Sequence, residues 1–433
     1  MLEINSVIMM SVDHIMRGFK SLITLDEALK RIDKEVKPIT DKERIKIDKA
    51  SWRVAAEDVI APINNPPFDR STVDGYAVRF EDVISASSSN PVVIELIGES
   101  LPGKPFEGAL SAYQGVYVST GAKMPKGANA VVPVEYTRKV DNNKVAILRS
   151  VSSGENVSIL GEDIKKGDVI LEKGTIIFPH NLAYLVSAKI TEVLVYRKTK
   201  IGVIVTGSEI ISPFDEMTEE KIIDSLSYLI PSMFNLNAFG FHHFGRVSDD
   251  EIEIEKCIEQ GLEYADVLII TGGTSVGKAD MSSKIVSNLE GSKKLFHGVS
   301  IQPGKPVGIY KIGSDKFIVL LPGYPVSAYF CLIKIVKPLL LKIQGVKKVF
   351  YHEPIIKAVL RRRVSTKLGV RTFVRVKLFK KDEILYADPI HTSGSGLLST
   401  LAKADGYFEV PENLEGVEAG TVVDVKPFET KII

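Results

Sequence analysis

Hydrophobic residues between positions 200 and 346 fall into short apolar runs that alternate with amphipathic segments. The runs 201–205, 267–270 and 317–321 are continuous and rich in β-branched residues, a pattern typical of strands buried on both faces of a parallel sheet. Between the first two runs, 251–264 repeats apolar residues at helical spacing. This alternation predicts a doubly wound α/β domain with helices on both faces of a parallel sheet.

The regions that flank this domain have different patterns. Thr24 and Glu27 form a capping box at the start of an amphipathic helix. Residues 80–155 read as short strands broken by glycine and proline, and the last part of the chain returns to strands. We therefore expect a multidomain α/β and β protein with four parts: an N-terminal helical and extended domain (21–75 and 155–197), a small inserted β domain (76–154), the α/β domain (198–346) and a C-terminal β domain (347–433).

The stretch 265–284, ADVLIITGGTSVGKADMSSK, carries the clearest candidate chemistry. An apolar strand stops at a glycine-rich loop, and the next helix starts soon after it. Glycines let a backbone approach a ligand closely, and the N–H groups of such a loop and helix start attract anions. A carboxylate beside a bound phosphate favours an intervening cation, so Asp280 suggests Mg²⁺. The loop residues that we expect to contact the anion are Gly272, Gly273, Ser275 and Gly277.

Two other interpretations of this stretch remain open. It can be a tight turn between strand and helix that binds nothing. It can also be a phosphate-binding P-loop, because Gly272, Gly277 and Lys278 fit the spacing G-x-x-x-x-G-K. Ala279 stands where a P-loop needs a serine or threonine hydroxyl, which argues against that interpretation.

Further candidate residues follow other strands of the same domain. In doubly wound sheets, ligands bind beyond the carboxyl ends of the strands. Glu209 follows the run 201–205, and the loop 322–327 follows the run 317–321, so both should lie near Asp280. Lys305, in the non-helical sequence QPGKP, supplies a cation between them.

Composition and charge narrow the class of protein. The 433 residues are 45% hydrophobic and 25% charged, with a formal net charge of +1, so nothing global favours nucleic acid or an anionic membrane. No apolar run reaches transmembrane length, and the N-terminal sequence is a poor signal peptide. We expect a cytoplasmic protein. Cys257 and Cys331 both lie in apolar helical patterns, which favours core positions over a disulfide or a zinc site.

Six motifs together resemble one family. They are FDRSTVDGYAVR, STGAKMPKGANAVV, TGSEI, TGGTSVGKAD, PGKPVG and LPGYPVSA, and they occur in the order seen in the molybdopterin molybdenumtransferases, the MoeA and gephyrin family. Each motif alone is a weak signal, but six in order over nearly the whole chain are specific. The resemblance implies a molybdopterin-binding α/β domain like that of MoaB and Mog, a C-terminal β-barrel, and a homodimer whose active site is shared between subunits.

The resemblance also implies an activity, the last step of molybdenum cofactor biosynthesis. Adenylylated molybdopterin is hydrolysed with Mg²⁺, AMP is released, and molybdate or tungstate is inserted as the substrate oxyanion. Glycine N–H groups, a lysine and hydroxyls suit a phosphorylated substrate and a tetrahedral oxyanion. The sequence shows no Ser-His-Asp or Cys-His arrangement, so we expect catalysis by positioning and electrostatics.

The resemblance assigns roles to residues outside the glycine loop as well. It implies catalytic roles for Asp74, Glu209, Asp280 and Lys305, with Asp280 and Glu209 as the metal ligands. It implies substrate contacts, besides the glycine-loop residues named above, at Thr120, Asp163, Asp249, Gly304, Pro322, Gly323, Arg375 and Ser393.

The sequence departs from the family pattern at two loop positions. Gln302 stands where some members have a second lysine, and Tyr324 replaces the usual asparagine of LPGNP. Two alternatives to the transferase remain: a P-loop-like nucleotide hydrolase, which would turn over free ATP, and a non-catalytic binding scaffold of the same fold.

Overall fold

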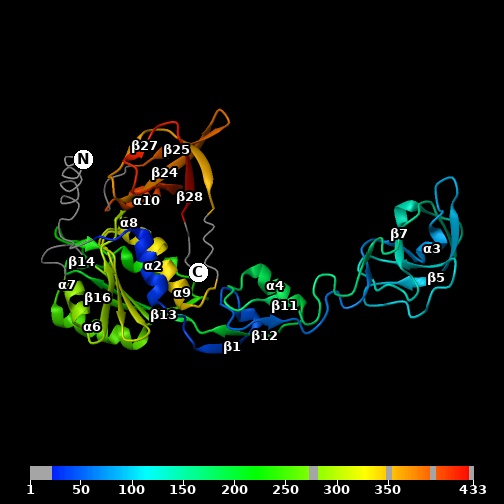
Figure 1. The fold of residues 1–433 in the computed structure, drawn as a ribbon, viewed down its shortest axis with the longest axis horizontal. Helices are drawn as coiled ribbons and strands as arrows, with labels where there is room; N and C mark the ends of the chain where they lie inside the picture. The colour runs from blue at the N-terminus through cyan, green and yellow to red at the C-terminus, as the bar shows by residue number, and fades with distance from the viewer. Residues whose placement is uncertain (1–21, 273–280, 348–353, 391–395, 429–433) are drawn as a thin grey trace, which may run out of the picture. The chain divides into compact units, whose positions relative to one another are not determined.

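The computed structural model describes residues 22–272, 281–347, 354–390 and 396–428 (Figure 1). The chain divides into two compact units. The first comprises Met1–Ala56, Lys173–Ile177 and Leu194–Ile433, and the second comprises Glu57–Glu172 and Phe178–Val193. The four-part division expected from the sequence is finer than these two units, and its boundaries stay a proposal.

A six-stranded sheet forms the centre of the first unit. Four neighbouring strands are parallel: β16 (Phe239–Val247), β13 (Thr199–Thr206), β17 (Val267–Thr271) and β21 (Lys316–Leu321). The sheet continues with β20 (Gly308–Ile312), which pairs antiparallel with β21, and β18 (Ser292–His297), which pairs antiparallel with β20. Only Gly313, Ser314 and Asp315 join β20 to β21, and so short a link permits a hairpin but no parallel crossover. The predicted doubly wound sheet is confirmed, with an antiparallel edge added.

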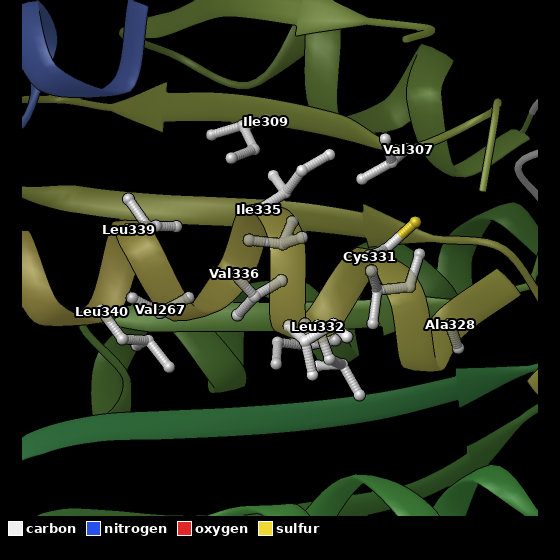
Figure 2. Close-up of a cluster of buried hydrophobic side chains, with 14 of the residues drawn as sticks. Val267, Val307, Ile309, Ala328, Cys331, Leu332, Ile335, Val336, Leu339 and Leu340 are labelled. Atoms are coloured by element: carbon white, nitrogen blue, oxygen red, sulfur yellow. The ribbon is translucent and has the colours of Figure 1, made fainter. Parts of the chain in front are cut away.

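Helices cover both faces of this sheet, as the apolar runs predict. Successive side chains of a strand point to opposite faces. Val267 and Ile269 therefore pack into one core cluster, and Leu268 and Ile270 into another. The first cluster is shared with α2 (Leu25–Glu35), α5 (Leu226–Met233), α8 (Pro325–Cys331), the π-helical turn Leu332–Val336 and α9 (Lys337–Ile343), and Figure 2 shows part of it. The second is shared with α6 (Glu251–Tyr264) and α7 (Met281–Asn288).

A closed five-stranded β-barrel follows in the C-terminal region, as the resemblance implied. Its strands are β24 (Arg371–Lys381), β25 (Ile384–Pro389), β22 (Ile356–Leu360), β28 (Val422–Pro427) and β26 (Gly406–Val410), and pairing of β26 with β24 closes it. A short strand of the α/β part, β19 (Ile301–Gln302), pairs in parallel with the start of β24. Nearby lie β23 (Val364–Ser365), β27 (Gly416–Val417) and α10 (Leu398–Ala402).

The second unit is built around another six-stranded sheet, which confirms the predicted small β domain. Its order is β7 (Ala130–Pro133), β4 (Gly75–Val78), β6 (Gln114–Val118), β5 (Val92–Ser100), β9 (Lys144–Ile147) and β8 (Thr137–Lys139). Two clusters of buried aliphatic residues fill it. The unit also contains β2 (Val59–Ile60), β3 (Arg70–Ser71), α3 (Phe80–Val83), β10 (Val157–Ser158), β11 (Val169–Leu171) and α4 (Pro179–Ser187).

Three smaller features concern the burial of the cysteines, the length of apolar helices and the start of α2. Cys257 and Cys331 are buried in the two cores of the α/β sheet, as their apolar patterns predicted. Among the described residues, no helix is long and apolar enough to cross a membrane. Thr24 caps α2 by accepting a hydrogen bond from the backbone N–H of Glu27, which confirms the predicted helix start.

Candidate functional site

A cavity of about 930 Å³ lies where strands of the α/β sheet end, within the first unit. The carboxyl ends of β13, β17 and β21 contribute Thr206, Thr271 and the loop from Pro322 to Tyr324. The 300–306 segment and residues of the C-terminal barrel region complete the wall. Of the residues that the sequence analysis selected, those that line this cavity are Glu209, Gly272, Gly304, Lys305, Pro322, Gly323 and Arg375.

The turn after β17 brings the backbone close to the cavity. Gly272 has a φ of +87°, in the left-handed region that favours glycine. A Cβ at this position would lie 2.3 Å from the carbonyl oxygen of Thr206, so no larger residue fits. The Thr206 hydroxyl donates a hydrogen bond of 3.1 Å to the Thr271 carbonyl and joins the ends of β13 and β17. Gly272 therefore lines the cavity in a conformation that no larger residue can take, and contact of its backbone with a ligand stays a prediction.

Glu209 supplies an exposed carboxylate on the turn after β13. Its backbone carbonyl accepts a hydrogen bond from Ile222, and the Lys221 ammonium donates to the neighbouring Ser208 carbonyl, so this turn is held from two sides. Asp249 binds the same turn from outside: its backbone N–H donates to the Ser208 hydroxyl at 2.9 Å. Asp249 is exposed and is not among the described residues that line the cavity.

Three cationic side chains line the cavity: Lys305, Lys367 and Arg375. Arg375 is 1% exposed and lies on β24 opposite Tyr407, and burial lowers the pKa of its guanidinium. Lys305 is half-buried, and burial, followed by repulsion from Lys367, lowers the pKa of its ammonium. Burial and like charge both disfavour the cationic form, so a bound anion would relieve an existing electrostatic cost here.

Asp224 is a carboxylate in the cavity wall that the sequence analysis did not select. It is 3% exposed, and the backbone N–H and the hydroxyl of Ser227 both donate to it. The Ser227 oxygen also lies 2.7 Å from Nε2 of His243, whose pKa is lowered chiefly by burial, and Arg246 is 3.7 Å from the carboxylate. Serine lies between acid and histidine, whereas nucleophilic activation requires histidine in the middle. This cluster therefore fixes Asp224 and does not make Ser227 a nucleophile.

The second unit holds a separate group of selected residues. Asp74 is exposed just before β4, and its carboxylate accepts two hydrogen bonds from Thr120: 2.6 Å from the backbone N–H and 2.9 Å from the hydroxyl. These bonds lower the pKa of Asp74. The next residue, Gly75, leaves no room for a Cβ, which would lie 2.2 Å from the Val132 carbonyl oxygen. Asp163, also exposed, accepts a hydrogen bond from Asn65 at 3.2 Å.

Some selected residues lie outside the part of the chain that the structure describes. They are Gly273, Ser275, Gly277, Asp280 and Ser393. Within the described ranges, no group of three or more histidine, cysteine, aspartate or glutamate side chains is placed to hold a metal ion. The predicted metal ligands are therefore represented in the structure by Glu209 alone.

Lys367 and Asp224 show what the sequence analysis missed. Lys367 follows a run of exposed arginines and carries no motif of its own, so only the position of the barrel reveals it. Asp224 stands two residues after the exposed Ile222 in the sequence IIDSLSYLI. An aspartate three residues before Ser227 in a helical pattern is a usual capping signal, and that signal alone does not point to a cavity.

Comparison with known protein families divides the chain into three matched regions. Residues 23–188 match the MoeA N-terminal region (domain I and II). Residues 202–342 match a probable molybdopterin binding domain. Residues 357–428 match the MoeA C-terminal region (domain IV).

Individual proteins match over nearly the whole chain. A putative molybdopterin biosynthesis protein of Methanocaldococcus jannaschii is 36% identical over 95% of this chain and 99% of its own length. A molybdopterin molybdenumtransferase of Bacillus subtilis is 31% identical over 93% of both chains. The crystal structure of a molybdopterin biosynthesis MoeA protein from Pyrococcus horikoshii OT3 is similar with a TM-score of 0.78 and 33% identity, and covers 94% of this chain and 100% of that one.

Proposed function

The chain belongs to the MoeA family of molybdopterin molybdenumtransferases, and from this membership we propose the reaction that its cavity carries out. It is a transferase of molybdenum cofactor biosynthesis. We infer that it binds adenylylated molybdopterin, cleaves the phosphoanhydride to release AMP, and inserts molybdate into the dithiolene. We propose a cytoplasmic location for this reaction.

One observation carries this proposal: a single cavity combines an acidic wall with a cationic wall at the carboxyl ends of parallel strands. Glu209 extends from the strand side, and Lys305 and Arg375 line the part toward the barrel. Doubly wound sheets bind ligands at this edge. Cations suit both phosphate groups and a tetrahedral oxyanion, and a carboxylate suits a metal ion bound to phosphate.

The residues present fit a magnesium ion. Mg²⁺ in enzymes is commonly bound by one or two carboxylates together with substrate phosphates and water, so a cluster of three acids is not required. Glu209 is exposed within the cavity and available to such an ion, and we propose Asp280 as its second carboxylate. When bound, Mg²⁺ neutralises negative charge on the phosphoanhydride oxygens.

The chain itself contributes positioning and electrostatic stabilisation. Lys305 and Arg375 hold anionic oxygens in place, and their burial strengthens each contact by excluding water. Gly272 lines the cavity, and we propose that its backbone contacts the ligand there. Water attacks the phosphorus on the molybdopterin side, and the bond from that phosphorus to the bridging oxygen breaks. AMP leaves with this oxygen, and the proton that water loses passes to solvent. No covalent enzyme intermediate is needed.

We also propose that the active enzyme is a homodimer and that Asp74 of one subunit serves the cavity of the other. Asp74 and Thr120 are exposed and lie in the second unit, whereas Glu209 and Lys305 lie in the first. A two-fold dimer presents the same surface of both subunits to each other, so it can complete two equivalent sites. We propose that Asp163, another exposed carboxylate of the second unit, also contacts the substrate in this shared site.

Turnover of adenylylated molybdopterin with molybdate is the direct test. We expect the purified protein to release AMP and form the metal-containing cofactor, and to do the same with tungstate, which has the same charge and shape. Chelation of Mg²⁺ should stop AMP release. Free ATP in place of the adenylate is the discriminating control: rapid ATP hydrolysis would favour the P-loop alternative, and the absence of all turnover would favour a binding scaffold.

A further inference from the structure

Lys367 joins the cavity from a segment that none of the family motifs includes. It lies in the turn between β23 and β24, where the backbone N–H of Val370 donates to its carbonyl. The same turn is fixed at both ends: Thr366 donates to Glu415, and Gly369 donates to Glu412. These bonds fix the backbone of Lys367, and the flexible side chain that carries the ammonium is ordered when an anion binds.

Backbone pairing brings this turn beside the segment that carries Lys305. Ile301 and Gln302 form β19, which pairs in parallel with Arg371 and Thr372 at the start of β24. The Arg371 N–H also donates to the Ser300 carbonyl at 3.0 Å. The chain turns back after β19, because the Val299 N–H donates to the Lys305 carbonyl at 2.9 Å. Lys305 therefore lies beside the start of β19, at the end of the pairing that Lys367 precedes on the other segment.

Lys305 and Lys367 both line the cavity, and burial, followed by repulsion from Lys367, lowers the pKa of the Lys305 ammonium. Two other cations of this region are paired with carboxylates. Arg371 is engaged by Asp26 and Glu412, and Lys334 by Glu409. Among the described carboxylates, none forms an ion pair with Lys367. Two like charges placed together at a cavity wall favour an anion carrying two negative charges.

We propose that Lys367 and Lys305 together clamp one tetrahedral dianion in this cavity, with Lys367 acting as a substrate-binding residue from the barrel side. This rests on the proposed function for the identity of the anion, which is either the substrate's phosphate or molybdate. The two sources share charge and shape. Gln302, on β19, also lines the cavity but is neutral, so it adds no positive charge beside Lys305.

Anion binding in the absence of pterin tests the clamp separately from turnover. We would titrate molybdate, inorganic phosphate and AMP into the full-length protein and into Lys367→Ala, by calorimetry at low salt. Lys357→Ala is the matched control, because Lys357 is an exposed lysine of the same barrel that does not line the cavity. We expect about 5- to 20-fold weaker binding of the clamped anion for Lys367→Ala, near the low end for a charge-assisted contact because Lys367 is exposed, and wild-type binding for the control.

The separate probes identify the anion. Weaker binding of molybdate alone assigns the clamp to molybdate, and weaker binding of AMP and phosphate assigns it to the substrate's phosphate. Lys367→Arg should keep most of the affinity because it keeps the charge. If Lys367→Ala binds every probe as Lys357→Ala does, or if the wild-type protein binds none, the clamp is wrong. A wild-type protein that binds anions through Lys367 but does not turn over would instead overturn the proposed function.

A second measurement reports on the geometry directly. Removal of a neighbouring positive charge favours the charged form of an ammonium, so the pKa of Lys305 should rise in Lys367→Ala. Titration of Lys305 by NMR of the labelled ammonium would show this shift, and Lys357→Ala should show none. An unchanged pKa of Lys305 would place the two ammonium groups too far apart to share one anion.

Discussion

Two regions of the molecule differ in how they position candidate functional side chains. One is the cavity of the first unit, and the other is the exposed Asp74–Thr120 pair of the second unit, called here the Asp74 edge. The cavity collects residues far apart in sequence, among them Thr206, Lys305 and Arg375, and burial lowers the pKa of the two cations. At the Asp74 edge, one exposed carboxylate is oriented by one exposed threonine, and the pKa of that carboxylate is lowered by hydrogen bonds.

This difference indicates what each region can do alone. A cavity of about 930 Å³ with both signs of charge can enclose much of a ligand by itself. An exposed carboxylate with two fixed hydrogen bonds is oriented but not enclosed, so it gains a catalytic environment only when another surface covers it. This contrast supports the proposed shared site.

The largest effect is expected from combining two inactive variants. Asp74→Asn and Glu209→Gln should each remove most turnover while keeping the fold, because both side chains are exposed. Unfolded and refolded together in equal amounts, they should form heterodimers in about half the population, each with one intact site, so about a quarter of wild-type activity should return.

Subunit exchange has to be demonstrated by mass spectrometry of differently tagged chains. If both residues serve the same chain's site, every site in the mixture carries a mutation and activity stays at the level of the separate variants. That result, with exchange confirmed, would show that the Asp74 edge and the cavity of one chain work together.

A second prediction separates the stabilities of the two units. Phe330 of α8 is fully buried, stacks on Phe373 at 4.8 Å and contacts Tyr407 edge-on, so it joins the α/β core to the barrel. Phe330→Ala should cost the first unit about 3–5 kcal/mol. Hydrogen exchange, measured unit by unit, should show faster exchange in β17 and β24 but not in β6.

The matched variant acts on the other unit. Ile94 is 1% exposed in the core of the second unit, and Ile94→Ala should cost about 2–5 kcal/mol there. Ile94→Ala should speed hydrogen exchange in β6 but not in β17 or β24, the reverse of Phe330→Ala. Equal loss of protection in both units from either substitution would mean that the chain unfolds as one cooperative body.

The parts of this architecture that the sequence predicted share a physical cause. Strands such as β17 are buried on both faces, so every position is apolar and the run is visible without any partner. Loop glycines such as Gly272 are equally visible, because a steric requirement selects one residue type. These two signals predicted a ligand site at the edge of the sheet where the structure has a cavity.

The parts that the sequence missed depend on packing between distant segments. Nothing local marks Lys367, because its role arises only when β19 pairs with β24. The Asp224 cluster likewise joins α5 to β16, and neither periodicity nor spacing indicates that His243 meets Ser227. The direction of β20 is set by a short link, which an apolar run does not reveal.

A smaller effect is expected at the cationic wall. Lys305→Ala removes one half-buried ammonium from the cavity, and we expect molybdate or AMP to bind about 10-fold more weakly, as for one charge-assisted hydrogen bond. Added salt should weaken wild-type binding in the same direction, because it screens the same attraction. Affinity equal to that of the wild type would assign Lys305 to the protein surface, and Lys357→Ala again controls for the loss of one charge.

The smallest effect concerns the acid limit of activity. The Thr120 backbone and hydroxyl both lower the pKa of Asp74, so the carboxylate stays ionised until the pH falls through this lowered value. The contribution of ionised Asp74 to turnover is therefore fully present above the ordinary pKa of an aspartate. It is lost only as the pH falls through the lowered pKa.

Thr120→Val removes the hydrogen bond from the hydroxyl but keeps the one from the backbone, so the pKa of Asp74 should rise part of the way to its ordinary value. The acid limb of the pH–activity profile should move upward in Thr120→Val and stay in place in Thr120→Ser, which keeps the hydroxyl. Identical acid limbs in both variants and the wild type would show that ionisation of Asp74 does not limit turnover.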